Sequence, residues 1–351
     1  MKYQNVFYFK SINSVGGCES FFYYLAKTYK NMVVFYKEGN PEQIKRLAEL
    51  IEVRRYTGQH IECDNFFCCY YPDIIDNVDA KMYAHLIHCD YKNVWFSPII
   101  NPKFNKYIAV SKVAGESFKE ITGIDYELIY NPIKIDKPKI EKKKGNVLHL
   151  VSATRLTREK GLKRMQKLCY ILNQAGINYD WTIFTNRKRE AVGQNAIYKD
   201  PRLDIIEEIA KADYLVQLSD CEAFCYSIVE ALSCGVPVIA TDLPVLKELG
   251  VKHGENAVIC DFNMNNVDTE MIKQGFGAIN FEPPKSDWGK YLDNNTKYKP
   301  SDIIKVRVRR SYTDLVLGHL GRGEIKDMTK ARASYLEAKD LVEVLWLSYQ
   351  L

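Results

Sequence analysis

The stretch from Ser219 to Asp242, SDCEAFCYSIVEALSCGVPVIATD, constrains the fold more than any other part of the chain. It begins where one apolar segment, 212–218 (ADYLVQL), ends, and it closes on a second, 236–241 (VPVIAT). Both segments are bounded and composed like buried strands. A short helix is expected between them. Its predicted core face consists of Ile228, Val229, Ala231 and Leu232.

Two carboxylates bracket the start of this helix, with seven residues between them: Glu222 and Glu230. In open α/β sheets, ligands collect where strand ends meet helix N-termini, because the free amides there attract anions. Free amides at 224–227 beside two hydroxyl-binding carboxylates suit a sugar carried on a diphosphate. A structural alternative exists for Glu230, since Ser227 and Glu230 also have the spacing of a capping box.

The whole stretch resembles the E-x7-E signature of retaining glycosyltransferases of family 4, which have the GT-B fold. The resemblance implies an α/β protein with two Rossmann-like domains facing a cleft. It places Glu222 on the hydroxyls of the donor sugar and Glu230 on the nucleotide ribose. Ala223 and Cys225 stand where the family usually has glycine, and the side chain of Cys225 narrows the donor pocket. The donor-binding amides implied are those of Phe224, Cys225 and Tyr226.

A second motif follows the strand expected at 147–153. The loop 154–161, TRLTREKG, resembles the family's G-R-L-x-x-x-K-G, with Thr154 in place of the first glycine. The resemblance assigns Arg155 and Lys160 to the donor diphosphate. Negative charge grows on this leaving group as the glycosidic bond breaks, and fixed cations stabilise it. The neighbouring cations fit a solvent-exposed surface better: Arg158, Lys163 and Arg164.

The N-terminal half shows a similar alternation of strands and helices, beginning with a strand at 2–9 and a helix at 19–29. Between them lie Gly16 and Gly17. Glycines at such a turn let a ligand approach the backbone closely, although many turns need only a left-handed residue. GGCES resembles the family's first glycine-rich loop, G-G-x-E. His88 follows a strand at 82–87, where the resemblance places a histidine near the transferred sugar; a purely structural role, or His85 instead, is the alternative.

The resemblance covers residues 3–291 and divides the chain into four parts. These are an acceptor-side domain (1–133), a basic linker (134–145), a nucleotide-sugar-binding domain (146–300) and a small C-terminal appendage (301–351). The linker lysines are interpreted as a solvated hinge or, alternatively, a lipid-facing patch. A crossover back to the N-terminal domain is expected near Trp288. The appendage is expected to contain a strand and one or two helices, and it distantly resembles short modules of bacteriophage structural proteins; a simple packing tail is the alternative.

Composition narrows the class of protein. A net charge of +5 over 351 residues does not favour a dedicated nucleic-acid binder. The ten cysteines include no C-x2-C pair, and no D-x-D occurs, so reduced thiols and no metal site are expected. No apolar run approaches the roughly 20 residues of a membrane helix, so any membrane contact is expected to be peripheral. The lack of a signal peptide predicts a cytoplasmic protein, free or at the inner membrane face.

Together these observations predict a retaining, metal-independent glycosyltransferase with a nucleoside diphosphate sugar, preferably UDP-linked, as donor and no separate cofactor. The acceptor stays open among glycans, lipid-linked glycans and proteins, and so does homo-oligomerisation. The usual glycine-rich turn is missing after the strand at 179–185, which leaves the base open as well. Two alternatives are a sugar-nucleotide epimerase on the same fold and a binding protein whose decayed site is marked by Ala223 and Cys225.

Overall fold

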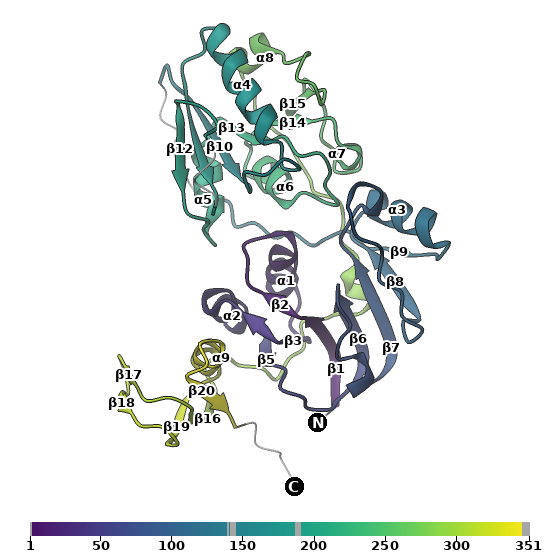
Figure 1. The fold of residues 1–351 in the computed structure, drawn as a ribbon, viewed down its shortest axis with the longest axis vertical. Coiled ribbons are helices and arrows are strands. Elements are labelled where there is room, and N and C mark those ends of the chain that lie inside the picture. The colour runs from purple at the N-terminus through teal and green to yellow at the C-terminus, as the bar shows by residue number, and fades with distance from the viewer. Residues whose placement is uncertain (1, 139, 141–144, 187–190, 346–351) are drawn as a thin grey trace.

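The computed structural model describes residues 2–138, 140, 145–186 and 191–345. Within these ranges the chain forms two α/β domains, stacked along the long axis of the molecule, and a small appendage at the far end of the N-terminal domain (Figure 1). Each domain has one parallel sheet. The predicted α/β class is confirmed.

The N-terminal domain is built on a seven-stranded sheet of order β5-β3-β1-β6-β7-β8-β9 in which every pair is parallel. In β1 every residue from Asn5 to Phe9 is buried, as expected for a sheet covered on both faces. The strands are β1 Lys2–Phe9, β3 Val33–Tyr36, β5 Glu52–Arg55, β6 Ile61–Cys69, β7 Val78–Ile87, β8 Lys106–Ala109 and β9 Glu127–Leu128. The helices are α1 Gly17–Thr28, α2 Pro41–Ala48 and α3 Lys112–Thr122, and β2 Ser11–Ile12 pairs with β4 Glu38–Gly39.

The C-terminal domain is built on a six-stranded parallel sheet of order β12-β11-β10-β13-β14-β15. Strands β10 and β13 are neighbours at its centre, so the loops that follow them meet at one edge. The strands are β10 Leu148–Ala153, β11 Tyr179–Phe184, β12 Ala196–Lys199, β13 Tyr214–Gln217, β14 Val238–Thr241 and β15 Ala257–Cys260. The helices are α4 Leu162–Gln174, α5 Ile205–Lys211, α6 Tyr226–Ser233, α7 Pro244–Glu248 and α8 Thr269–Gln274.

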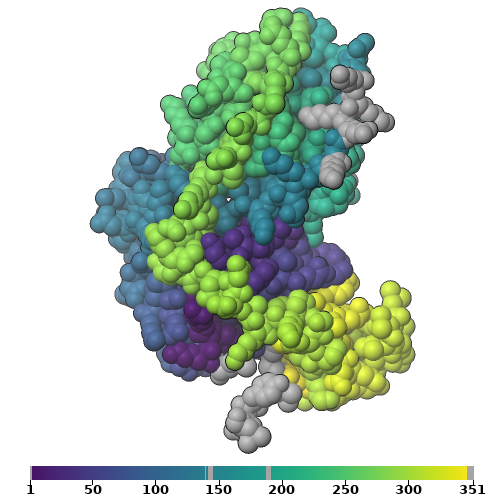
Figure 2. Space-filling model, turned by 180° about the vertical axis from the view of Figure 1, so that it is seen from behind, coloured from purple at the N-terminus to yellow at the C-terminus, as the bar shows by residue number. Residues whose placement is uncertain are grey.

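After α8 the chain returns to the N-terminal domain, running along the back of the molecule in Figure 2. Trp288 anchors this return. It is fully buried, and its ring lies 5.6 Å from those of Phe21 and Phe67 and 5.8 Å from that of Phe7. Burying a large aromatic side chain contributes several kcal/mol in order of magnitude. The crossover expected near Trp288 therefore ties the two domains together a second time.

The appendage differs from the expectation of one strand and one or two helices. It has five strands and one helix: β16 Ile303–Val308, β17 Tyr312–Asp314, β18 Gly318–Leu320, β19 Ile325–Thr329, β20 Val342–Val344 and α9 Lys330–Ala338. Strands β19, β16 and β20 form an antiparallel sheet, and β17 and β18 a hairpin. Four of the five strands (β17, β18, β19 and β20) have only three to five residues, too few for a period-two pattern to be recognised in the sequence.

The appendage has a small core of its own and rests on α2 and β5 of the N-terminal domain. Ser334 of α9 donates a hydrogen bond to the carbonyl of Val53 (3.4 Å), and Asp340 pairs with Arg55 (3.4 Å). The Arg55–Asp340 pair is partly exposed and contributes little stability, whereas the hydrogen bond of Ser334 is buried. The C-terminal segment 341–351 is described only as far as residue 345.

A chain that ends at Pro300 should therefore fold, with a melting temperature several degrees below that of the full chain. It keeps Tyr298, whose hydroxyl donates a 2.5 Å hydrogen bond to the carbonyl of Ala48 in α2, and it loses the packing of α9 on α2 and β5 together with the contacts of Ser334 and Asp340. Circular dichroism melts and gel filtration of both chains measure the effect. Aggregation of the short chain would show that the appendage covers a face of α2 that cannot be left exposed.

Candidate active site

The site predicted from the E-x7-E stretch lies at the carboxyl edge of the C-terminal sheet. The Nζ atom of Lys160, in the loop after β10, lies 2.6 Å from Oε1 of Glu222, in the loop after β13. The same oxygen accepts hydrogen bonds from Gln217 Nε2 (2.9 Å) and Ser219 Oγ (2.7 Å). The two charged side chains are only 22% and 15% exposed. The structure thus brings together two of the predicted catalytic residues.

The charge on Lys160 is secured by its partner. Burial lowers the pKa of this ammonium, but the adjacent Glu222 carboxylate outweighs burial by charge and by hydrogen bonding, so the pKa lies above its usual value. A permanently charged ammonium beside a carboxylate offers a phosphate contact and a hydroxyl contact within one site.

A close backbone approach sets this geometry. Gly161 has a left-handed φ of +82°, and a Cβ atom there would lie 1.9 Å from the carbonyl oxygen of Leu218. Only glycine fits both constraints. Because Lys160 is the preceding residue, the contact places its side chain beside the loop that carries Glu222.

The expectation that Arg164 is a solvent-exposed surface cation is wrong. Its side chain is largely buried, donates from Nε to the carbonyl of Leu218 (2.8 Å), and pairs with Asp220. The signal was present in the sequence, since Arg164 lies four residues before Leu168, on the buried face of α4. Arg164 therefore pins the loop between β13 and Glu222.

Arg155 lies at the surface, in contrast to Lys160. Its side chain is 59% exposed and lies 3.5 Å from Glu159 in an i, i+4 pair. An exposed pair of this kind contributes little and leaves the guanidinium free to turn. In this structure the fixed cation of the site is Lys160.

The start of α6 shows why glycine is usual where this chain has cysteine. Cys225 is the residue before the helix, and its φ of +63° lies in the left-handed region. The N-cap side chain makes no capping hydrogen bond, and the Cys225 thiol faces the amide of Ile228 in the first turn. The side chains of Phe224 and Tyr226 are buried, and the Tyr226 hydroxyl donates to the carbonyl of Pro132 (3.1 Å). Any donor contact from these positions is made by the backbone.

Glu230 is buried against the N-terminal domain. The hydroxyl of Tyr24, on α1, donates a 2.8 Å hydrogen bond to its Oε1, and the rings of Tyr24 and Tyr226 stack with centroids 5.4 Å apart. Burial raises the pKa of Glu230, and the bond from Tyr24 partly offsets this rise. The capping-box alternative is wrong, because Ser227 lies inside the helix and the carboxylate bonds to Tyr24.

Gly16 and Gly17 lie where α1 begins. Gly16 is extended (φ −141°), so a left-handed turn is not the reason for glycine there. A Cβ atom on Gly17 would meet no atom within 4 Å, which leaves open space beside the backbone. Glu19 closes the loop by accepting from Ser14 N (3.1 Å) and Ser14 Oγ (2.8 Å).

His88 is packed among N-terminal side chains. Its Nε2 lies 3.4 Å from the sulfur of Cys69, and its ring meets Phe21 edge-on at 5.0 Å. Burial, with a smaller contribution from His85, lowers the pKa of His88 to about 3. The imidazole is therefore neutral at physiological pH and is held by packing.

Sequence reasoning missed three residues that hold the carboxylates. Gln217 and Ser219 fix Glu222, and Tyr24 bonds Glu230. A glutamine inside an otherwise apolar strand was a usable signal for the first two. Tyr24 gave none, because it lies 206 residues from its partner in the chain.

Comparison with known proteins identifies the same part of the chain. Residues 133–271 match the family of glycosyl transferases group 1. The fold is GT-B. Anabaena HepE, solved with UDP and glucose, shares 17% sequence identity with a TM-score of 0.62, covering 78% of this chain and 89% of HepE.

Two further solved structures share the fold. A glycosyltransferase from Rickettsia africae ESF-5 has 14% identity and a TM-score of 0.54, over 77% of this chain and 86% of its own. WaaG, a glycosyltransferase involved in lipopolysaccharide biosynthesis, has 14% identity and a TM-score of 0.50, over 77% and 88%. No curated protein sequence matches the chain. The match to group 1 spans both segments of the site, 154–161 and 219–242.

Three further properties of the described residues concern their thiols, metal ligands and membrane-spanning helices. All ten cysteines are free thiols. No cluster of three or more His, Cys, Asp or Glu side chains in the described ranges is arranged to hold a metal ion. Among the helices described, none has the length and apolar character needed to span a bilayer.

Gly161→Ala should disrupt the site. The new Cβ atom would overlap the Leu218 carbonyl, and left-handed alanine adds about 1 kcal/mol or more of strain. Gly176→Ala is the matched control, because Gly176 is also left-handed (φ +66°) but has open space around its Cβ position. Thermal melts should show a much larger loss for Gly161→Ala. Equal losses would mean that the contact with Leu218 does not constrain the loop.

Proposed function

We propose that the protein is a retaining glycosyltransferase that uses a nucleoside diphosphate sugar, preferably UDP-linked, and needs no divalent metal. The observation that carries the proposal is the buried Lys160–Glu222 pair within the segment that matches group 1 glycosyltransferases. The structures of HepE with UDP and with UDP-glucose favour UDP as the nucleotide.

The Lys160–Glu222 pair supplies one contact to each side of the bond that breaks in the donor, the diphosphate side and the sugar side. The Lys160 ammonium would stabilise charge on the departing diphosphate, together with the first amides of α6. The Glu222 carboxylate would hold hydroxyls of the transferred sugar. Three donors already converge on its Oε1 (Lys160, Gln217 and Ser219), which orients it as a hydrogen-bond acceptor. This arrangement does not require Glu222 to act as a nucleophile.

In this proposal the acceptor attacks the sugar from the face on which the phosphate leaves, so the configuration of the sugar is retained. The leaving phosphate helps to take the acceptor's proton. His88 is not needed as a base, since its imidazole is packed against Cys69 and Phe21. Arg155 would join the diphosphate only by turning from Glu159. The acceptor would bind on the N-terminal side of the cleft.

The direct test is turnover of UDP-glucose with and without chelator. The protein should bind UDP-glucose in excess EDTA, with a thermal stabilisation of about 2.7 kcal/mol at roughly a hundredfold excess over Kd. Released UDP should be detected without added metal. Glu222→Gln should keep UDP binding, because Lys160 and the first amides of α6 remain, and lose most of the turnover, because the carboxylate that holds the sugar and pairs with Lys160 is gone. Binding that chelator abolishes and magnesium restores would contradict the metal-free proposal.

Tyr24 should compete with the donor for Glu230. If Glu230 binds ribose hydroxyls, the nucleotide must replace the Tyr24 hydroxyl, whose bond to a carboxylate contributes about 1.5–3 kcal/mol. Tyr24→Phe removes the competitor, so it should tighten UDP binding by roughly tenfold in calorimetry. Tyr23→Phe, at the adjacent position of α1, is the matched control. Weaker binding by Tyr24→Phe would mean that Tyr24 instead orients Glu230 for the nucleotide.

The same variant has a pH signature. Burial holds the pKa of Glu230 above its unfolded value, so its protonation favours the folded state at low pH and this contribution is lost as pH rises. Losing the Tyr24 bond raises the folded pKa further. The stability deficit of Tyr24→Phe should therefore be small in acid and grow toward neutral pH.

A further inference from the structure

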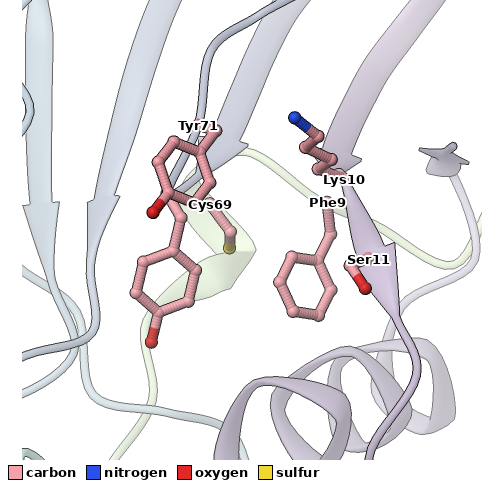
Figure 3. Close-up of a pocket in the computed structure, with 6 residues that line it drawn as sticks. Phe9, Lys10, Ser11, Cys69 and Tyr71 are labelled. Carbon is pink, nitrogen blue, oxygen red and sulfur yellow. The ribbon is translucent and has the colours of Figure 1, made fainter. Parts of the chain in front are cut away.

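A pocket in the N-terminal domain is separate from the donor residues. It has a volume of about 270 Å³ and lies at the ends of β1 and β6, which are neighbours in the sheet. Phe9, Lys10 and Ser11 form one side, and Cys69 and Tyr71 lie across from them (Figure 3). Tyr70 completes the lining. Its position at the carboxyl edge of a parallel sheet is where open α/β folds bind ligands.

Tyr70 is held in a strained conformation that shapes this pocket. Its φ of +58° lies in the left-handed region, which is unusual for a bulky aromatic residue. Its hydroxyl lies 3.5 Å from the sulfur of Cys18 and 3.8 Å from that of Cys89. Strain of this kind persists where the surroundings fix it, and it is concentrated at ligand sites.

The walls of the pocket are apolar, and its rim is cationic. Lys10 Nζ lies 3.2 Å from Asp73 and 5.6 Å from the ring centre of Tyr71. Lys37 contacts the same Asp73 carboxylate at 2.8 Å. Two ammonium groups thus share one carboxylate, which leaves a net positive charge beside an aromatic pocket. This combination matches a ligand with an apolar part and an adjacent anion.

The surrounding loops carry exposed apolar side chains at the same sheet edge. Trp95, in the segment after β7, is 96% exposed, and Tyr71, after β6, is 63% exposed. Val15, after β1, is also exposed. Exposed aromatic side chains beside lysines are typical of surfaces that meet lipid headgroups.

Other ligands fit less well. A sugar ring inside the pocket would leave hydroxyls without partners against aromatic walls. An extended peptide would need free backbone groups, yet the Lys10 carbonyl already accepts from the amides of Lys37 and Glu38, and β2 pairs with β4.

We infer that this pocket binds the apolar part of a lipid-phosphate acceptor, with the anion held by Lys10. The inference rests on the proposed function for the role of the ligand as acceptor, but the binding site itself can be tested alone. The ligand class it names is a lipid phosphate, which shares the lipid part of the lipid-linked glycans left open by the sequence but carries no glycan.

The test measures binding to the full chain by calorimetry with three probes: geranyl phosphate, geraniol and inorganic phosphate. Geranyl phosphate should bind saturably, geraniol about tenfold more weakly, and inorganic phosphate not measurably, because both the apolar part and the anion contribute. Equal binding of geraniol, or binding of phosphate alone, would overturn the inference.

Lys10→Gln and Lys37→Gln form a matched pair. Each removes one ammonium from Asp73, but only Lys10 lines the pocket. Lys10→Gln should weaken geranyl phosphate about tenfold, to the level of geraniol, and Lys37→Gln by less than about threefold. Equal losses of affinity in the two variants would overturn the role of Lys10, since they would show that only the summed positive charge around the pocket matters. Tyr71→Ala should weaken both geranyl probes.

UDP binding, measured on the same samples, separates the two proposals. All three variants should bind UDP as the unaltered chain does. Binding of geranyl phosphate without any UDP binding would contradict the proposed glycosyltransferase and leave the pocket standing as a lipid-phosphate site. UDP binding without geranyl phosphate binding would overturn the pocket and leave the donor site intact.

Discussion

The contact between Gly161 and the Leu218 carbonyl determines the geometry of the candidate site. It brings the loops after β10 and β13 closer than any side chain at position 161 would allow. Lys160 and Glu222 then meet in a largely buried setting, where each would be costly without the other. Arg164 bonds the same carbonyl from the opposite side, so one backbone oxygen organises three charged side chains. The pair is thus a consequence of backbone packing as well as of charge.

Residue patterns along the chain predicted the parallel sheets and the centre of the site. Strand and helix periodicity is local, and the signature from Glu222 to Glu230 lies within one strand-loop-helix unit. The partners across domains could not be read in this way, because no local pattern links Tyr24 to Glu230. Lys160 is marked by its place in the motif and Arg164 by its spacing from Leu168, but the bond of Arg164 to the Leu218 carbonyl appears only in the structure. The appendage was only partly predicted, because β16 alternates charged and apolar residues but the other four strands have three to five residues each, too few for a periodic pattern to be recognised.

The appendage and the proposed acceptor pocket are joined through β5. Arg55 pairs with Asp340 of the appendage and lies 3.4 Å from the carbonyl of Lys37. The side chain of Lys37 in turn shares Asp73 with Lys10 at the pocket rim. These contacts are mostly half-exposed, so each contributes little stability. They connect the appendage, through β5, to the rim of the proposed acceptor pocket.

The two domains are also held together at the cleft by carboxylates of the C-terminal domain. Glu230 accepts from Tyr24, and Glu248 accepts from the first amides of α3, Lys112 N (2.7 Å) and Val113 N (3.0 Å). Charged hydrogen bonds of this kind contribute about 1.5–3 kcal/mol each when buried, and less where water reaches them, as at half-buried Glu248. A micromolar ligand has only about 8 kcal/mol of binding free energy.

Opening this interface would therefore use a substantial share of that binding free energy. The apparent affinity of a donor that needs Glu230 is reduced by the fraction of molecules in which Tyr24 has left it. Tyr226 connects the contact between Tyr24 and Glu230 to the domain boundary. It stacks on Tyr24 and donates a hydrogen bond to the carbonyl of Pro132, where the chain leaves the N-terminal domain. A displacement at that crossing point would therefore reach the helix that carries Glu230, and a donor that bound Glu230 would couple its own occupancy to the separation of the domains.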